Sequence, residues 1–314
     1  MAAVGRSHRS FSTLAVSWRQ KRAVRGAALV ATLCIFAAPL HAAICVIDDA
    51  QRQVCVERPA QRIIALSPGA TELLFSSGAG ENTVAAVAHS DFPEEAKKLP
   101  RVGSYKRIDL EAVLALKPDL IVAWRSGNPL PQTEQLEALG FAVYYAEPLR
   151  FEGVSTTIER FSLLAGTEAF GAGVAQKLRD DVAALRHQYA QAATVPVFYE
   201  VWREPLMTIN NDHLISEAIG VCAGVNVFGE LPSLAPRISE EAVLKEDPEV
   251  IVAGGMGEDD PSWLEPWKQF SALQAVKRNN LFFVAPSTLQ RPTPRMVEGI
   301  RTLCAHLETA RARR

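Results

Sequence analysis

LEAVLALKPDLIVA, residues 110–123, is followed 130 residues later by EEAVLKEDPEVIVA, residues 240–253. Eight of the fourteen aligned positions are identical. In each copy a helical pattern stops before a proline, Pro118 or Pro248, and a short apolar run typical of a buried strand follows. We interpret the two stretches as the same helix–strand unit in two related halves of the chain. The alternative is a chance likeness between two ordinary helix–strand units.

Apolar runs alternate with helical patterns around both copies of the repeat. This alternation is typical of parallel sheets covered by helices on both faces, so the sequence predicts an α/β fold with two lobes. Strands are predicted at 62–66, 84–87, 119–123, 141–145, 197–201, 250–253 and 281–284, and helices at 71–77, 110–116, 216–223 and 240–245.

A different pattern fills residues 171–193, which contain no proline. Apolar residues recur there at steps of three and four, which predicts an amphipathic helix. At 1.5 Å per residue, this helix would be about 35 Å long and could cross from one lobe to the other. The alternative is that it packs on one lobe only. The apolar stripe consists of Val174, Leu178, Val182, Leu185 and Tyr189.

The first 42 residues resemble an export signal. They hold six basic residues and no acidic one, and residues 27–40 form an apolar run of 14 residues, too short to span a membrane. We expect cleavage near Ala42; a buried helix of a cytosolic protein is the alternative. The remainder carries 27 basic and 35 acidic side chains, a net charge of −8 that argues against nucleic-acid binding.

Four cysteines remain after residue 42, and they allow three pairings. Cys45 and Cys55 flank a polar turn between two β-rich runs, so an antiparallel pairing centred on Ala50 places their sulfurs opposite each other. Cys222 and Cys304 are then left to pair. A zinc site is the alternative, but no two cysteines have the close spacing of zinc motifs, and we expect no bound metal.

Motifs of catalysis are missing: there is no G-x-S-x-G turn, P-loop or H-E-x-x-H sequence. The four histidines after residue 42 are scattered. His187 and His306 fall in helical patterns, where we expect solvated surface. An enzyme such as a metal-dependent hydrolase would have only His89 and His213 with nearby acids to use. We therefore expect a protein that catalyses no reaction.

Aromatic and polar residues follow the predicted strands. Trp124 and Trp202 come directly after strands, and Ser67 begins a helix whose first turn contains Pro68. In parallel α/β sheets the carboxyl ends of the strands line the ligand crevice, so we expect these residues there. Tyr105 would join the two indoles, which suits a large, partly flat and partly apolar ligand. The alternative is that both tryptophans belong to the core.

Four motifs resemble the periplasmic substrate-binding proteins that have a rigid helical backbone. These receptors serve ABC importers for vitamin B12, haem, ferric siderophores and some metals. The resemblance covers most of residues 43–310 and is closest to the family's vitamin B12 (cobalamin) receptors. The motifs are SPGATELLFSSGAG at 67–80, SDFP at 90–93, LEAVLALKPDLIVAWRSGN at 110–128 and PTPRM at 292–296.

The resemblance implies two Rossmann-like lobes joined by one long helix, with ligand held between them. It suggests a signal peptide at 1–42, an N-terminal lobe at 43–150, an inter-lobe helical segment at 151–194 and a C-terminal lobe at 195–314. The expected protein is a monomeric periplasmic receptor without a prosthetic group. It would carry cobalamin or a related corrinoid to the permease of an ABC importer; a haem or ferric-siderophore receptor is the alternative.

Particular residues receive roles from the resemblance. Trp124 and Arg291 match corrin-contacting residues, and Glu111 and Glu241 match glutamates that dock onto the permease. Cys222 and Cys304 match a disulfide of the family. His89, Ala235 and Ser287 replace a tyrosine, a tryptophan and an aspartate, and Trp202 replaces the aromatic surface lost at Ala235. The expected ligand-binding set is Ser67, His89, Tyr105, Trp124, Trp202 and Arg291.

Overall fold

The computed structural model describes residues 43–255 and 257–314, so the predicted signal segment lies outside the described residues. Two four-stranded sheets, each with all neighbouring strands parallel, form the centres of two α/β lobes. The N-terminal lobe has the order β4 (Thr83–Ala86), β3 (Ile63–Ala65), β7 (Leu120–Trp124), β8 (Val143–Ala146). The C-terminal lobe has the order β10 (Gly224–Asn226), β9 (Val195–Glu200), β11 (Val250–Ala253), β12 (Leu281–Phe283).

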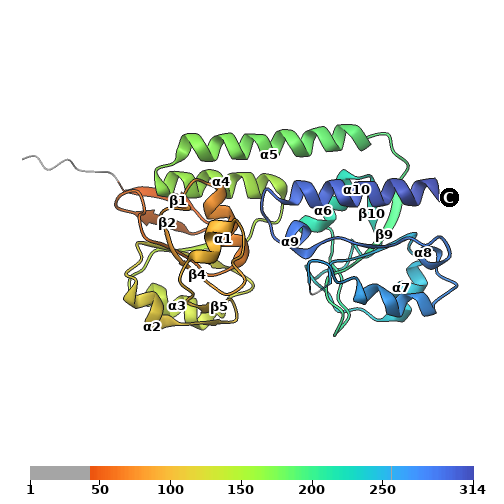
Figure 1. The fold of residues 1–314 in the computed structure, drawn as a ribbon, viewed down its shortest axis with the longest axis horizontal. Coiled ribbons are helices and arrows are strands. Elements are labelled where there is room, and N and C mark those ends of the chain that lie inside the picture. Colours follow the sequence, from red (N-terminus) through yellow and green to blue (C-terminus); the bar gives the residue numbers. More distant parts are fainter. Residues whose placement is uncertain (1–42, 256) are drawn as a thin grey trace, which may run out of the picture. The chain divides into compact units, whose positions relative to one another are not determined.

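Helices cover and connect the two sheets (Figure 1). They are α1 (Pro68–Ser76), α2 (Leu110–Ala115), α3 (Leu130–Ala138), α4 (Phe151–Ala165), α5 (Glu168–Tyr189), α6 (Leu214–Val221), α7 (Glu240–Glu246), α8 (Gln274–Lys277), α9 (Pro286–Leu289) and α10 (Met296–Ala312). Two 3₁₀ helices lie at Glu94–Lys98 and Ser262–Gln269, and a short antiparallel ribbon joins β5 (Gly103–Ser104) to β6 (Arg107–Ile108). None of the helices in the described part of the chain meets the length and hydrophobicity that a membrane span requires.

The internal repeat is confirmed as a structural unit. Its copies form α2–β7 and α7–β11, and in each sheet the repeat strand is third in the order. Both helices start with a side-chain cap, because Asp109 accepts from the N–H of Ala112 and Ser239 accepts from the N–H of Ala242.

The predicted long helix is α5, which starts three residues earlier and ends four residues earlier than expected. Leu178, Val182 and Leu185 are buried as the stripe predicts. The sequence pattern did not reveal that α4 is a separate helix. α4 ends at Gly166, whose left-handed conformation (φ 72°) allows the tight turn into α5.

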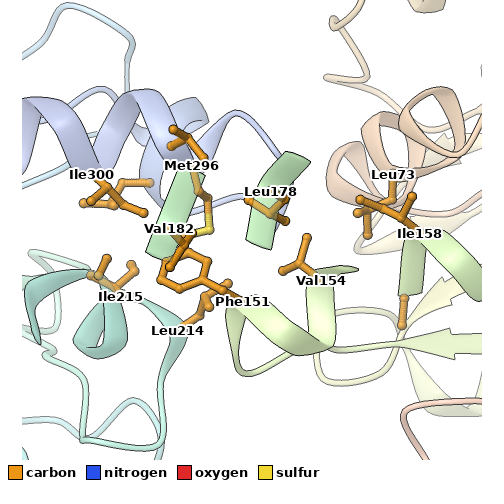
Figure 2. Packing of buried hydrophobic residues seen from close by; sticks show 14 of the residues in the cluster. Leu73, Phe151, Val154, Ile158, Leu178, Val182, Leu214, Ile215, Met296 and Ile300 are labelled. Carbon is orange, nitrogen blue, oxygen red and sulfur yellow. The ribbon is translucent and has the colours of Figure 1, made fainter. Parts of the chain in front are cut away.

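One hydrophobic cluster continues from the first lobe into the second (Figure 2). Leu73 of α1 belongs to it in the N-terminal lobe and Ile158 of α4 in the connecting segment, while Ile215 of α6 and Ile300 of α10 belong to it in the C-terminal lobe. Because the described residues from 43 onward form one compact unit with a shared core, the two sheets are held at a defined separation.

Both predicted disulfides are confirmed. Cys45 on β1 (Ile44–Ile47) lies opposite Cys55 on β2 (Gln53–Val56), as the antiparallel register around the turn predicts. Cys222 at the end of α6 is bonded to Cys304 in the middle of α10. This second bond links α10 to the C-terminal lobe, where α10 also packs against β9.

The two disulfides should contribute unequally to stability. Their cysteines lie 10 and 82 residues apart, and closing the longer loop removes more entropy from the unfolded chain. We expect Cys222→Ala with Cys304→Ala to lower the free energy of unfolding by about 4.5 kcal/mol, and Cys45→Ala with Cys55→Ala by about 2.7 kcal/mol. Denaturant unfolding of both double variants measures the difference. A larger loss for the hairpin pair would contradict this account.

Candidate functional site

A cavity of about 580 Å³ lies between the two lobes, within the usual size range of ligand sites. Residues of both lobes line it, from the α1 and β7 ends of the first lobe to the β9 end and the α9–α10 connection of the second. All six residues expected to bind ligand line this cavity, although a role in binding stays a prediction for each of them. They are Ser67, His89, Tyr105, Trp124, Trp202 and Arg291.

The N-terminus of α1 forms one wall. The hydroxyl of Ser67 accepts a hydrogen bond from the N–H of Ala70 (3.0 Å), and Pro68 occupies the first turn, as the sequence predicts. Thr71 anchors the same turn, because its hydroxyl is 2.9 Å from that of Ser90 on the loop that carries His89. His89 itself has a positive φ (65°), a conformation uncommon for residues other than glycine, and its side chain is exposed.

Trp124 owes its position to two neighbours in the sequence AWRSGN. Asn128 accepts from the Trp124 N–H (2.7 Å) and donates to the carbonyls of Leu66 and Tyr105 (both 2.9 Å). One buried amide therefore joins three chain segments that form the cavity wall. A Cβ on Gly127 would come within 1.9 Å of the Trp124 ring, so only glycine permits this fold of the indole over the loop.

Tyr105 and Glu147 flank the Trp124 ring. The Tyr105 and Trp124 rings are 5.7 Å apart between centroids, and the indole N–H of Trp124 lies 3.4 Å from a carboxylate oxygen of Glu147. The Glu147 backbone N–H in turn donates to Asp49 in the β1–β2 turn (2.7 Å). The disulfide hairpin thus supports the wall that carries Trp124.

On the opposite lobe, Trp202 follows β9 and is 38% exposed, compared with 37% for Trp124. Neither indole is a core residue. The Trp202 ring packs edge-on against Trp263 (5.7 Å between centroids), and its N–H donates to the Glu204 carbonyl (2.8 Å). The next residue, Arg203, does not line the cavity and pairs with Glu240 of α7 (2.7 Å).

Arg291 connects the two lobes. Its guanidinium lies 2.7 Å from the carboxylate of Glu72 on α1 and 2.7 Å from that of Asp91. Glu72 is buried, and it also accepts from Thr293 (3.1 Å) and Arg295 (3.3 Å). Burial raises the pKa of Glu72 above its ordinary value, which Arg291 opposes by its hydrogen bond and its charge. Arg291 therefore serves as a cross-lobe ion-pair partner as well as a cavity residue.

Charge along the cavity wall is mainly negative. The carboxylates of Asp91, Glu147 and Glu258 line it, whereas Arg291 is the single lysine or arginine among the lining residues of the described chain. Because Arg291 is already paired with two carboxylates, the cavity offers no uncompensated positive charge to a polyanionic ligand.

Sequence reasoning did not place His213 in the site. It caps the N-terminus of α6, where its Nδ1 accepts from the Ile215 N–H (3.1 Å), and it is one of the residues that line the cavity. The sequence signal that could have placed it there is its position between the strand β9 and the helix α6, because loops that follow parallel strands line the crevice. His187 is exposed as expected, but the expectation for His306 was wrong. His306 is partly buried, stacks on Phe282 and lies 3.1 Å from the Phe283 carbonyl.

Glu111 and Glu241 lie away from the cavity. Each is exposed in the first turn of its helix, α2 or α7, and Figure 1 shows both helices on the side of the described unit that faces away from α5. Within residues 43–255 and 257–314, no group of three or more metal-ligating side chains is close enough to hold an ion.

Comparison with known proteins agrees with this architecture. The family model described as periplasmic binding protein matches residues 63–288. A vitamin B12-binding protein of Vibrio campbellii is 35% identical over 257 residues, covering 82% of this chain and 92% of the relative. The crystal structure of the periplasmic vitamin B12-binding protein of Vibrio cholerae matches with a TM-score of 0.74 and 34% identity, covering 81% of this chain and 98% of that one. A haem-binding protein crystallised with two haems shares the fold (TM-score 0.71, 21% identity, 81% and 99% coverage).

A buried carboxyl beside the Trp202 wall should make stability depend on pH. Glu200 at the end of β9 is fully buried, and burial raises its pKa to about 7, although Trp267 donates to it (2.6 Å). The folded state holds this proton more tightly than the unfolded state, so stability is lost as pH rises from about 4.5 through 7. Glu200→Gln should therefore raise the free energy of unfolding at pH 8 by about 1 to 3 kcal/mol.

Denaturant unfolding at pH 8 and at pH 4.5 tests this prediction, because the gain should nearly vanish at the lower pH. Glu204→Gln, an exposed carboxyl on the same loop, is the matched control and should show little change at either pH. A gain from Glu200→Gln that is equal at both pH values would show that Glu200 is ionised throughout.

Proposed function

We propose, since the chain belongs to the periplasmic binding protein family, that it binds cobalamin or a related corrinoid between its lobes and delivers it to an ABC importer. The relatives named above are binding proteins, and we infer that this chain likewise carries its ligand unchanged. The observation that carries the proposal is the cavity itself, which combines indole surface from two lobes and the phenol of Tyr105 with no unpaired lysine or arginine among its described lining residues.

The chemistry of the wall favours a corrinoid over the other ligands of this fold. A corrin is broad and carries neutral carboxamides around its rim, which partly exposed rings and polar backbone groups can meet. Haem carries carboxylates and many siderophores are strongly anionic, so both would need free cations. Arg291 is paired with Glu72 and Asp91, and the other charged lining groups are carboxylates.

We assign the flat contacts to Trp124, Tyr105 and Trp202, and polar contacts at the rim to Ser67 and His89. Arg291 would donate to a corrin amide only with its remaining N–H groups, because two carboxylates hold its position. Calorimetric titration with cyanocobalamin tests the proposal, and haemin serves as the competitor. Tight binding of haemin without binding of cyanocobalamin would favour the haem receptor instead.

Delivery would use Glu111 and Glu241. They begin equivalent helices of the two related lobes, and a permease with two similar subunits would present matched cations to them. Exposed charges at such a surface contribute to orientation and association rate more than to affinity. We further propose that the receptor acts as a monomer in the periplasm, with a signal segment cleaved near Ala42 and lobes at 43–150 and 195–314 joined through 151–194.

Loss of the first aromatic wall should weaken ligand binding. Trp124→Ala removes a large partly exposed ring from the cavity, and we expect cyanocobalamin to bind about 1 to 3 kcal/mol less tightly. Phe170→Ala, which removes an exposed ring of α5 outside the cavity, is the control and should leave affinity unchanged. Unchanged affinity in a folded Trp124→Ala protein would remove Trp124 from the site.

Reversal of the two docking charges should separate binding from transport. Glu111→Arg with Glu241→Arg should abolish corrinoid uptake in cells because like charges would meet at the permease, while calorimetry with the isolated protein should show nearly unchanged binding. An acid in a first helical turn also stabilises the helix, by about 0.3 to 1 kcal/mol.

The control for that helical effect is Glu168→Arg with Glu298→Arg, which reverses first-turn acids of α5 and α10. Uptake should survive in the control. Normal uptake by the Glu111/Glu241 variant would limit the pair to a helical role, and loss of binding by the isolated variant would contradict the placement of the cavity.

A further inference from the structure

We infer that His213 is a fixed, uncharged hydrogen-bond donor of the ligand site, whose Nε2–H binds a neutral carbonyl oxygen such as that of a corrin side-chain amide. The inference rests on the proposed function and adds to it a specificity-determining residue. It also implies that His213 does not coordinate the central metal of the ligand.

The first step is the tautomer. The backbone N–H of Ile215 donates to Nδ1 of His213 (3.1 Å), so the lone pair of Nδ1 is already in use. A neutral imidazole that accepts at one nitrogen carries its proton on the other. Nε2 of His213 is therefore an N–H donor, and neither ring nitrogen has a free lone pair for a metal ion.

The second step is the protonation state. Burial lowers the pKa of His213 to about 4. The capping hydrogen bond also favours the neutral ring, since a protonated ring could not accept from the Ile215 N–H. The neutral tautomer consequently persists across the physiological pH range, and the side chain brings no charge to a site whose other charged lining groups are three carboxylates and the paired Arg291.

The third step is the unused donor. Among the described residues, no hydrogen bond from Nε2 to a protein acceptor is found, and His213 is one of the residues that line the cavity, as are Leu214, Ile215 and Leu234. His213 is only partly buried, so a ligand can reach this donor, and covering it with a bound ligand that offers no acceptor would be costly. The carboxylate of the adjacent Asp212 pairs with Arg150 (3.6 Å) and does not serve as the acceptor for Nε2.

The fourth step is the chemical class of the acceptor. A neutral N–H in an apolar wall binds an uncharged carbonyl without the cost of burying an unpaired charge, whereas a carboxylate at this place would lack a counter-ion. Side-chain amides of a corrinoid offer such carbonyls. The ring is held in place at the N-terminus of α6. The site would therefore bind a ligand with an amide here more tightly than one with a carboxylate.

The test uses the substitution His213→Asn. Asparagine is a favoured helix N-cap, so it can still accept from Ile215 while it removes the Nε2–H. We expect about tenfold weaker binding of cyanocobalamin by calorimetry, the scale of one lost hydrogen bond, with little change in the melting temperature. His187→Asn, the same change at an exposed position of α5, is the control and should bind normally.

Absorption spectra of aquocobalamin provide a second readout. Wild type and His213→Asn should cause the same spectral response on binding, because His213 is not a cobalt ligand. A response that disappears only in His213→Asn, or unchanged affinity for cyanocobalamin in the folded variant, would overturn the inference alone. Failure of the wild-type protein to bind cyanocobalamin would overturn the proposed function, and this inference with it.

Discussion

The continuous apolar core beneath α5 is the constraint on which the site depends. Residues of α1 from one lobe, of the connecting helix α4, and of α6 and α10 from the other lobe belong to the same buried cluster (Figure 2). Separating the lobes widely would expose this cluster to water, at roughly 25 cal/mol for each Å² of apolar surface. The two sheets are therefore held at a separation that leaves a cavity between the ends of their strands.

A polar counterpart to this apolar core lies at the edge of the cavity. Glu72, buried on α1, accepts from Arg291, Thr293 and Arg295 of the other lobe. A buried carboxylate is stable only with such partners, and removing one partner of a buried ion pair typically costs about 3 to 5 kcal/mol. The same pairing occupies Arg291, the one lysine or arginine of the cavity wall in the described chain. An interaction that joins the lobes thus also decides which ligand charges the site can accept.

Much of the fold and part of the site follow from local patterns. The repeat at 110–123 and 240–253 predicted one helix–strand unit per lobe, because proline stops and apolar runs are determined by nearby residues. Trp124 and Trp202 were predicted to face the crevice from their places at strand ends, and the structure puts them on opposite walls of one cavity. The periodic pattern covered only residues 171–193, and the resemblance implied one helical segment at 151–194, so helix α4 and the two-residue turn that separates it from α5 were not predicted.

The sequence by itself determined the α/β class, the two disulfide pairs and the long helix, because each depends on periodicity or turn chemistry. Strand ends and a helix start placed Ser67, Trp124 and Trp202 at the cavity, with Tyr105 expected beside them, whereas His89 and Arg291 were named from the family resemblance. Tertiary structure alone decided which partners those residues meet. Asn128 reaches Leu66 and Tyr105, Arg291 reaches Glu72 across 219 positions of sequence, and His213 caps α6 at the cavity. Such contacts arise from the packing of the two sheets against a shared core. No local sequence pattern encodes the distance between the two sheets.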